Sequence, residues 1–295
     1  MPELPEVEAL THFLHDRAVG RIVTGIEVGA LSALKTFRPG PQDLVGGAVV
    51  GTARHGKWLD LTVRPSGPEL HLLWHLSRAG WVRWSESLSS TPVRPGRSPI
   101  ALRVRLDDGS GFDLTEAGTR KRLAVYVVTE PAQVPQIATL GVEPLSPAFT
   151  RERFTELLTA RNQQIKGLLR DQGTIAGIGN AYSDEILLVA RTSPFALTGR
   201  LTVDQADRVF DATGAVLREA VDAATGRPAA ELKDAKRRGM RVHGRTGLPC
   251  PGWDGTPCGD TVHEVSFSDS SLQYCPTCQT GGRPLADRRM SRLLR

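Results

Sequence analysis

The stretch that decides the fold of the C-terminal part is residues 250–278, which read CPGWDGTPCGDTVHEVSFSDSSLQYCPTC. Its four cysteines form two pairs, Cys250 with Cys258 and Cys275 with Cys278. Thiolates carried by two turns can close a tetrahedral zinc site, and the second pair has the usual spacing. In the first pair seven residues intervene, where about two to four are usual, so this insert would have to loop out. Four unrelated buried cysteines are the alternative. A zinc held by four thiolates has no open position for chemistry and would be structural.

The same tail carries the net charge of the chain. Residues 225–295 contain 12 Lys and Arg against seven Asp and Glu, which accounts for the whole formal charge of +5. The preceding residues are electrically balanced. A basic region on a neutral body indicates a polyanionic partner, most simply nucleic acid. A solubilising basic face is the alternative.

Length and composition narrow the class of protein. A chain of 295 residues suggests two domains, and 40% hydrophobic with 23% charged residues is ordinary for a globular protein. The sequence contains no apolar stretch of membrane-spanning length, and the acidic start at residues 1–6 does not resemble a signal peptide. We therefore expect a cytoplasmic protein, which a nucleic-acid partner would associate with the nucleoid. In that compartment cysteines indicate metal binding or catalysis before disulfides.

The hydrophobic pattern divides the chain into a β-rich first half and a helical second half. Apolar positions at helical spacing predict a helix over residues 2–17. Runs rich in β-branched residues then predict strands over residues 21–28, 45–63, 69–84, 100–107 and 122–129. A linker over residues 131–147 leads to predicted helices over residues 150–160, 164–171, 180–190 and 202–224. Residues 241–274 again have a strand-and-turn pattern.

A glycine-rich turn, Gly177-Ile178-Gly179-Asn180, precedes one of these helices. Backbone N–H groups at such a turn can bind a phosphate, and the helix dipole favours an anion there. Lys166 would add a cation and Asn180 a side-chain donor. An ordinary corner between two helices is the alternative.

The N-terminus is a second candidate site. Removal of Met1 is expected before a small residue such as Pro2 and would expose a secondary amine. An α-amino group with a pKa of roughly 7.7–8.0 is partly neutral at pH 7, and a neutral amine can attack an electrophilic carbon to form an iminium ion. Glu3 and Glu6 lie close by for proton transfer. A start codon followed by a helix-starting proline is the alternative.

Basic residues lie in three segments of the β-rich half, residues 54–58, 75–81 and 120–123, and the first two segments also carry a tryptophan. Cations in loops reach phosphates, and loop side chains can wedge into a base stack. Taken singly, each segment could equally be a solvated loop.

Taken together, these residues resemble the formamidopyrimidine-DNA glycosylase/endonuclease VIII family. The resemblance rests on residues 1–8 (MPELPEVE), Lys57, residues 164–172 (QIKGLLRDQ), residues 177–185 (GIGNAYSDE), residues 244–247 (GRTG) and the four cysteines with Gln279. These motifs span nearly the whole chain in the order of the family.

The resemblance implies an α+β multidomain fold. It comprises an N-terminal antiparallel β-sandwich with a leading helix, a helical domain with a helix–two-turn–helix, and a C-terminal zinc-finger hairpin. On this sequence the expected boundaries are residues 1–130 for the catalytic sandwich, 131–149 for a linker, 150–240 for the helical domain and 241–295 for the zinc finger.

The resemblance also implies a chemistry. Pro2 would attack C1′ of a damaged nucleotide that is flipped out of the duplex, Glu3 would transfer protons with support from Glu6, and β,δ-elimination would then nick the strand. Catalytic roles are thereby implied for Pro2, Glu3, Glu6 and Lys57, and DNA contacts for Lys166, Asn180, Arg78, Lys121, Arg122 and Arg245. One structural Zn²⁺ on Cys250, Cys258, Cys275 and Cys278 and a monomer acting on damaged double-stranded DNA complete the expectation.

Several positions depart from the pattern of the family. Arg78 and Lys121-Arg122-Leu123 stand where Met and Arg-Arg-Phe are common, Ser270 replaces an arginine, and residues 226–244 are short for the loop that covers 8-oxoguanine. A glycosylase for an unusual bulky adduct and a catalytically weak damaged-DNA-binding protein therefore stay open as alternatives. A tautomerase with an N-terminal proline shares only the amine.

Overall fold

The computed structural model describes residues 1–96, 98–117, 120–267 and 270–286. The chain divides into two compact units. The first comprises Met1–Leu140 together with Ala224–Lys233, and the second comprises Gly141–Ala223 together with the residues from Asp234 onward.

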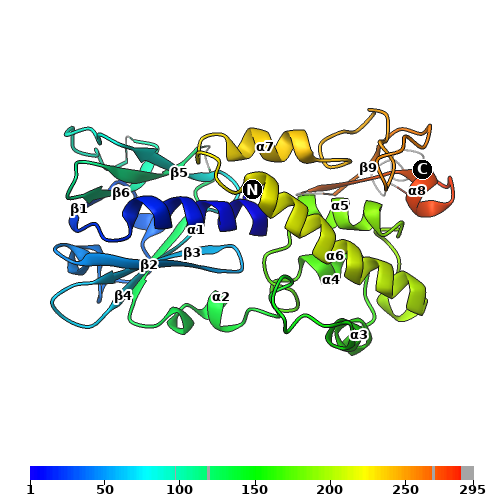
Figure 1. Cartoon of the computed structure of the whole chain (residues 1–295), viewed down its shortest axis with the longest axis horizontal. Coiled ribbons are helices and arrows are strands. Elements are labelled where there is room, and N and C mark those ends of the chain that lie inside the picture. The colour runs from blue at the N-terminus through cyan, green and yellow to red at the C-terminus, as the bar shows by residue number, and fades with distance from the viewer. Residues whose placement is uncertain (97, 118–119, 268–269, 287–295) are drawn as a thin grey trace. The chain divides into compact units, whose positions relative to one another are not determined.

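The first unit contains one long helix and two β-sheets (Figure 1). Its elements are α1 (Leu4–Ala18), β1 (Val23–Val28), β2 (Ala48–His55), β3 (Trp58–Arg64), β4 (Leu70–His75), β5 (Gly80–Ser85), β6 (Ile100–Leu106), β7 (Gly111–Glu116), β8 (Ala124–Val128) and the short α2 (Pro135–Ala138). One sheet has the strand order β1-β6-β7-β5 and the other β2-β3-β4-β8, with every pair antiparallel.

The alternation of side chains along β3 shows how the core forms between these layers. Leu59, Leu61 and Val63 are buried in the main hydrophobic core of the unit, while Trp58 belongs to a separate cluster on the other face of the sheet. Because successive residues of a strand point to opposite faces, this pattern fixes the register of the pairing. The core also contains α1 residues such as Leu10. The predicted sandwich with a leading helix is confirmed.

Two predicted strand runs are each two strands. Residues 45–63 form the β2–β3 hairpin, which turns at Gly56 with φ of +56°. The run over residues 69–84 changes sheets between β4 and β5, within the turn that ends at Gly80. A Cβ at Gly80 would lie 2.2 Å from the carbonyl oxygen of Leu76, so this tight turn requires glycine. β7 was not predicted, because its sequence GFDLTE lacks a run of β-branched residues.

The segment Ala224–Lys233 returns to the first unit late in the chain, which the sequence pattern did not predict. The indole Nε1 of Trp81 donates to the carbonyl of Ala229 at 3.0 Å. Leu232 is buried in the same core as α1, and the Lys233 ammonium lies 4.4 Å from the centre of the Trp81 ring. The β-sandwich core is therefore completed by residues from the second half of the sequence.

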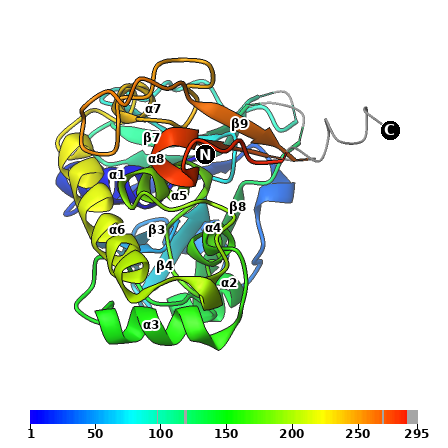
Figure 2. The ribbon, with the colours of Figure 1, turned by 90° about the vertical axis from the view of Figure 1, so that its right-hand side faces the viewer.

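The second unit is mostly helical and includes a small hairpin (Figure 2). Its elements are α3 (Arg151–Ala160), α4 (Ile165–Arg170), α5 (Asn180–Val189), α6 (Val203–Ala224), α7 (Leu232–Gly239), β9 (His263–Ser266), β10 (Ser271–Tyr274) and α8 (Pro276–Thr280). Helix α7, whose first two residues belong to the first unit, was not predicted.

Two turns join α4 to α5, and their own side chains hold them. The Asp171 carboxylate accepts the Gly173 N–H at 3.1 Å and the Thr174 hydroxyl at 2.7 Å. The Gln172 amide accepts the Gly177 N–H at 3.0 Å and donates to the Ile178 carbonyl at 2.7 Å. This is the predicted helix–two-turn–helix, fixed by residues that local sequence supplies.

Among the described residues, no helix combines the length and the apolarity needed to cross a bilayer.

Candidate active site and DNA-binding surface

The start of α1 places the acidic residues of the N-terminus. The Glu3 backbone N–H donates to the Glu6 carboxylate at 2.9 Å, as in a capping box, and Pro5 occupies the first turn. Both carboxyl-bearing residues are buried, with Glu3 2% and Glu6 3% exposed, and Pro2 is buried beside them. The capping contact fixes the backbone that precedes the helix, and with it the position of Pro2.

The β2–β3 turn carries Lys57, which is buried in the first unit. His75, at the end of β4, lies close to it: burial, assisted by the Lys57 charge, lowers the pKa of His75 to about 4. Its ring is therefore neutral at physiological pH, so Nδ1 can accept the Ser77 backbone N–H at 3.2 Å. Ser77 adopts a left-handed φ of +53°. A neutral imidazole thus holds the turn that presents Arg78.

The loop after β7 presents two further cations. The Glu116 carboxylate accepts the backbone N–H groups of Arg122 at 2.6 Å and Leu123 at 3.0 Å, and Lys121 donates to the Glu116 carbonyl. Lys121 and Arg122 are exposed. Leu123, by contrast, is 2% exposed and packs into the sandwich core, so it cannot serve as an apolar wedge where it lies. Sequence reasoning did not identify Glu116 as the residue that holds this loop.

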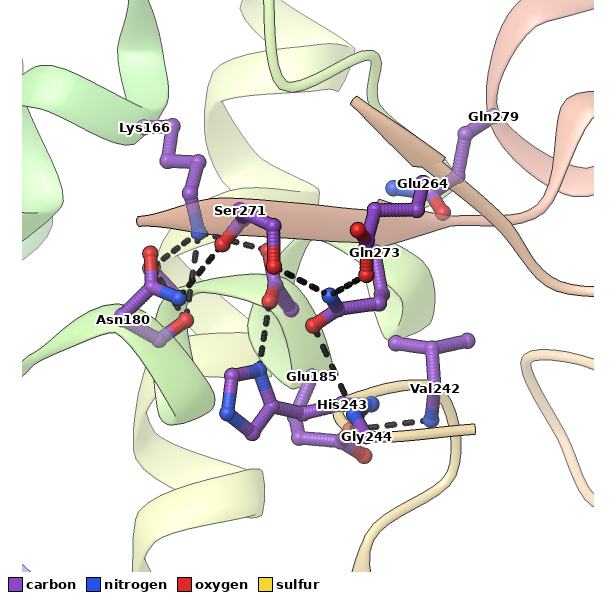
Figure 3. A network of polar contacts seen from close by, with 12 residues as sticks. Lys166, Asn180, Glu185, Val242, His243, Gly244, Glu264, Ser271, Gln273 and Gln279 are labelled. Atoms are coloured by element: carbon purple, nitrogen blue, oxygen red, sulfur yellow. Dashed lines mark hydrogen bonds and ion pairs between the residues drawn. The ribbon is translucent and has the colours of Figure 1, made fainter. Parts of the chain in front are cut away.

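In the second unit, Lys166 is buried instead of presented to solvent, and its side chain points toward Asn180 (Figure 3). Its ammonium contacts Asp184 Oδ1 at 2.5 Å, Ser183 Oγ at 2.7 Å and the carbonyl of Asn180 at 3.1 Å. All three partners belong to the first turn and a half of α5. The buried cation therefore fixes the N-terminal end of that helix, where Asn180 stands.

Asn180 is linked to the hairpin by its side chain. Its Nδ2 donates to the carbonyl of Ser271 in β10 at 2.7 Å, and its Oδ1 is buried without a protein partner among the described residues. Further along β10, Gln273 Nε2 donates to Glu264 Oε2 in β9 at 2.7 Å. One network of polar contacts thus joins the helix–two-turn–helix to the hairpin (Figure 3).

Two acidic residues of α5 hold the chain at residues 241–243. Asp184 Oδ2 accepts from His243 Nδ1 at 2.8 Å, and in Figure 3 the other ring nitrogen points away from the network. Glu185 accepts the backbone N–H groups of Arg241, Val242 and His243 at 2.7–2.9 Å. Burial nevertheless raises the pKa of Glu185. Arg245, for which a DNA contact was expected, lies two residues further along the chain and is partly exposed.

The four cysteine sulfurs converge, although seven residues separate the first two. All four Sγ atoms lie within 4.8 Å of one another. The intervening loop is tightly wound: a Cβ on Gly252 would lie 1.9 Å from the carbonyl oxygen of Thr256, and the Gly252 N–H donates to Cys250 Sγ at 3.3 Å. Burial raises the pKa of Cys250 to about 12. A cation that stabilises thiolates fits this donor set.

The two units therefore hold different parts of the predicted site. Pro2, Glu3, Glu6, Lys57 and the loop cations lie in the first unit, and Lys166, Asn180, Arg245 and the cysteines lie in the second. Sequence reasoning assigned no role to Asp184, Glu185 or His243. The two acids stand in a stretch that carries the family resemblance, but their partners at residues 241–243 are more than 50 residues away in the chain.

An antiparallel β-sandwich behind a leading helix, a helix–two-turn–helix and a four-cysteine hairpin together make up the arrangement that the resemblance to DNA glycosylases implies. Residues 1–125 match the formamidopyrimidine-DNA glycosylase N-terminal domain, and residues 140–229 match the formamidopyrimidine-DNA glycosylase H2TH domain. The chain belongs to the formamidopyrimidine-DNA glycosylase/endonuclease VIII family.

Similar proteins cover most of the chain. It is 32% identical over 291 residues to formamidopyrimidine-DNA glycosylase of Symbiobacterium thermophilum, a match that covers 95% of this chain and 89% of the relative. An uncharacterized formamidopyrimidine-DNA glycosylase-like protein of Mycobacterium tuberculosis is 54% identical over 164 residues, 56% of this chain and 99% of the relative. A solved complex of Lactococcus lactis Fpg with DNA containing an abasic site matches with a TM-score of 0.80, 25% identity, and coverage of 94% and 99%.

Proposed function

We propose that this protein is a bifunctional DNA glycosylase and abasic-site lyase of base excision repair. The class of enzyme follows from its family membership. The observation on this chain that supports the proposal is the capped start of α1, where Pro2 precedes the buried residues Glu3 and Glu6. Its partner is damaged DNA, as in the solved complex of Lactococcus lactis Fpg with DNA containing an abasic site, and we propose that this DNA is double-stranded. We place it in the cytoplasm with the nucleoid.

The proposed reaction begins once Met1 is removed and the Pro2 nitrogen becomes a secondary amine. The amine attacks C1′ of the damaged nucleotide, and the base departs. Glu3 transfers protons during base release and ring opening, and Glu6 holds the Glu3 backbone through the capping contact. The resulting iminium ion acidifies the neighbouring C–H bonds, which permits β- and then δ-elimination of the two phosphates.

The target base must leave the stack, because a base inside a duplex is out of reach of such chemistry. We assign phosphate contacts to Lys57 and Asn180, and contacts to the opened duplex to Arg78, Lys121 and Arg122. For Lys166 we propose an indirect role, since its ammonium already bonds three acceptors in α5. Arg245 extends the basic surface beside the cysteine hairpin.

We infer that one structural Zn²⁺ is held by Cys250, Cys258, Cys275 and Cys278. Bound zinc would crosslink the hairpin and supply no reactive position. A Cys275→Ser variant should lose the metal and weaken DNA binding while the β-sandwich of the first unit stays folded. Metal content by plasma emission and DNA binding by anisotropy measure this. A zinc content that stays near one per chain would contradict the assignment.

Borohydride trapping on abasic DNA tests the function. The wild type, shown by intact mass to begin at Pro2, should give a covalent complex. A chain with two residues added before Pro2 should give none, because an amide nitrogen is not a nucleophile. Equal trapping by both forms would show that the Pro2 amine is not the nucleophile. Tight binding with no trapping by the wild type would favour the alternative of a damaged-DNA-binding protein.

The preferred lesion is a second part of the proposal. Residues 228–232 are docked on the sandwich through Trp81 and Leu232, so they are not available to fold over a flipped base. We therefore propose oxidised pyrimidines, ring-opened purines or a bulky adduct as substrates ahead of 8-oxoguanine. A panel of these lesions in one duplex sequence tests the order, and efficient 8-oxoguanine excision would contradict it.

A further inference from the structure

One arginine in the first unit contacts both of the elements that carry proposed catalytic residues. Arg54 lies near the end of β2, three residues before Lys57. Its Nε donates to Glu8 Oε2 at 2.5 Å, and its Nη1 donates to the carbonyl of Gly56 at 2.9 Å. Glu8 stands in α1, the helix that begins behind Pro2. A single guanidinium thus links that helix to the turn that presents Lys57.

The contact with Gly56 determines how Lys57 is presented. The Gly56 carbonyl belongs to the peptide bond that leads into Lys57, and this bond is planar. Fixing the plane therefore fixes the direction in which the Lys57 side chain leaves the backbone. Gly56 adopts a left-handed φ of +56°. Glycine adopts positive and negative φ values about equally readily, so the conformation of this turn depends on contacts such as the one with Arg54.

The side chains of Arg54 and Glu8, which pair with each other, have little freedom to move. The Arg54 side chain is 9% exposed and that of Glu8 is 26% exposed. The second oxygen of Glu8 accepts from His12 Nε2 at 3.1 Å. A guanidinium is a rigid planar fork, so it can satisfy two acceptors at a set angle where a lysine ammonium cannot.

We infer that Arg54 is a positioning residue, which sets the position of the Lys57 side chain relative to Pro2 and Glu3. The inference rests on the proposed function, in which Lys57 grips a phosphate while Pro2 attacks the adjoining sugar. A purely structural role would be to dock α1 on β2. That docking has separate support, because Thr52 Oγ1 donates to the carbonyl of Thr11 at 3.1 Å and α1 residues fill the core.

The test compares Arg54→Lys and Glu8→Gln with a matched control, Arg64→Lys. Arg64 pairs with Glu69 at 2.9 Å in the same sheet but on the surface. For each protein we would measure the single-turnover rate of borohydride trapping at saturating abasic DNA, the dissociation constant for an uncleavable abasic analogue, and the melting temperature. The double variant Arg54→Lys/Glu8→Gln completes a cycle.

We expect Arg54→Lys to lower the trapping rate by about ten- to a hundredfold, as a small misplacement of a catalytic group does. The loss of affinity should be smaller, and the melting temperature should be nearly unchanged. Glu8→Gln should have a smaller effect in the same direction, and the double variant should be no slower than Arg54→Lys, because both act through one contact. Arg64→Lys should match the wild type.

Three outcomes would overturn the inference. Arg54→Lys could trap at the wild-type rate, it could lose rate only in proportion to lost folded protein, or the effects of the two substitutions could simply multiply. Trapping by the wild type distinguishes these failures from a failure of the proposed function, since a wild type that does not trap would overturn both.

Discussion

The start of α1 and the Lys166–Asp184 network both bury charged side chains, but they are held together in different ways. Glu3 and Glu6 are joined by a contact between residues three apart in the chain. In the network, Asp184 and His243 are 59 residues apart, and Asn180 and Ser271 are 91 apart. The first region is organised locally, and the second exists only after the unit has folded.

The two regions should therefore respond differently to substitution. On the proposed function, Glu3→Gln removes a proton-transfer group while the amide, which has the same shape, keeps the place of the side chain at the start of α1. A change at Asp184 leaves a buried ammonium and an imidazole without their shared carboxylate. We therefore expect substitutions in the first region to reduce the rate, and substitutions in the second to reduce stability and DNA affinity together.

The largest effect should follow from Glu3→Gln. Glutamine keeps the shape of the side chain but cannot transfer a proton, so base excision should slow by about 10²- to 10⁴-fold, with an unchanged melting temperature. Single-turnover release of an oxidised pyrimidine measures the rate. Asp16→Asn, on the exposed side of the same helix, is the control and should match the wild type. A rate within a few-fold of the wild type would remove Glu3 from the mechanism.

Asp184→Ala should be the most destabilising of the substitutions in the network. It leaves Lys166 buried without its carboxylate, which costs about 3–5 kcal/mol of unfolding free energy. Urea unfolding of the full chain measures this. Asp211→Ala, which breaks an exposed pair with Arg151, should cost no more than about 1 kcal/mol. Equal effects of the two would show that the buried pair has no special role.

Asn180→Ala should lower DNA affinity by a smaller amount, with a small loss of stability because the hydrogen bond to the Ser271 carbonyl is also lost. Loss of one side-chain donor to a phosphate is expected to weaken binding by about tenfold, to the same extent on every sequence, because the contact is with the backbone. Anisotropy with three duplexes of different sequence around one abasic analogue measures this. Gln163→Ala, before α4 and away from the α5 turn, is the control. A loss confined to one sequence would indicate a base contact instead.

An effect of similar size to the loss at Asn180 is a dependence of stability on pH that arises on the outer face of β3. The buried Asp60 carboxylate contacts His55 at 3.0 Å and His71 at 2.9 Å. The hydrogen bond to Asp60 raises the pKa of His71. Although burial opposes it, hydrogen bonds from His55 and His71 lower the pKa of Asp60. The His71 contribution is thus present below its unfolded pKa and lost as pH rises through the folded value. The Asp60 contribution is present above its unfolded pKa and lost as pH falls.

Both contributions are therefore complete between about pH 4 and pH 6.5, the unfolded pKa values of the two groups. Compared with Asp60→Asn, the wild type should be more stable by about 1–2 kcal/mol in that window, with a smaller difference at pH 9. Urea unfolding of both proteins across the range measures it. A difference that does not vary with pH would exclude the two histidines as its source.

The sequence predicts the features that are organised locally and misses those that depend on contacts between distant residues. The helix at the N-terminus, the two turns before Asn180 and the convergence of the cysteines were predictable, because each depends on spacing within a few turns of chain. The insert before Cys258 is accommodated by glycines that permit a tight loop. The two-sheet architecture followed from alternating runs of β-branched residues and from the family resemblance.

What the sequence did not predict depends on partners that are distant in the chain. Lys166 carries the same charge whether it faces DNA or Asp184, and only the fold shows that it is buried. Leu123 was aligned with a wedge residue, yet the Glu116 carboxylate turns its backbone so that the side chain enters the core. Neither distinction is present in local composition.

The docking of Ala224–Lys233 on the sandwich has a consequence for synthesis on the ribosome. The chain crosses from one unit to the other at three places, and the first unit is not complete until Leu232 has emerged. Until then a nascent sandwich exposes the surface around Trp81 that Ala229 and Leu232 cover in the finished protein. The order of translation therefore requires residues 141–223 of the second unit to be made before the first unit can close its core, and a chain truncated before residue 224 would lack part of both units.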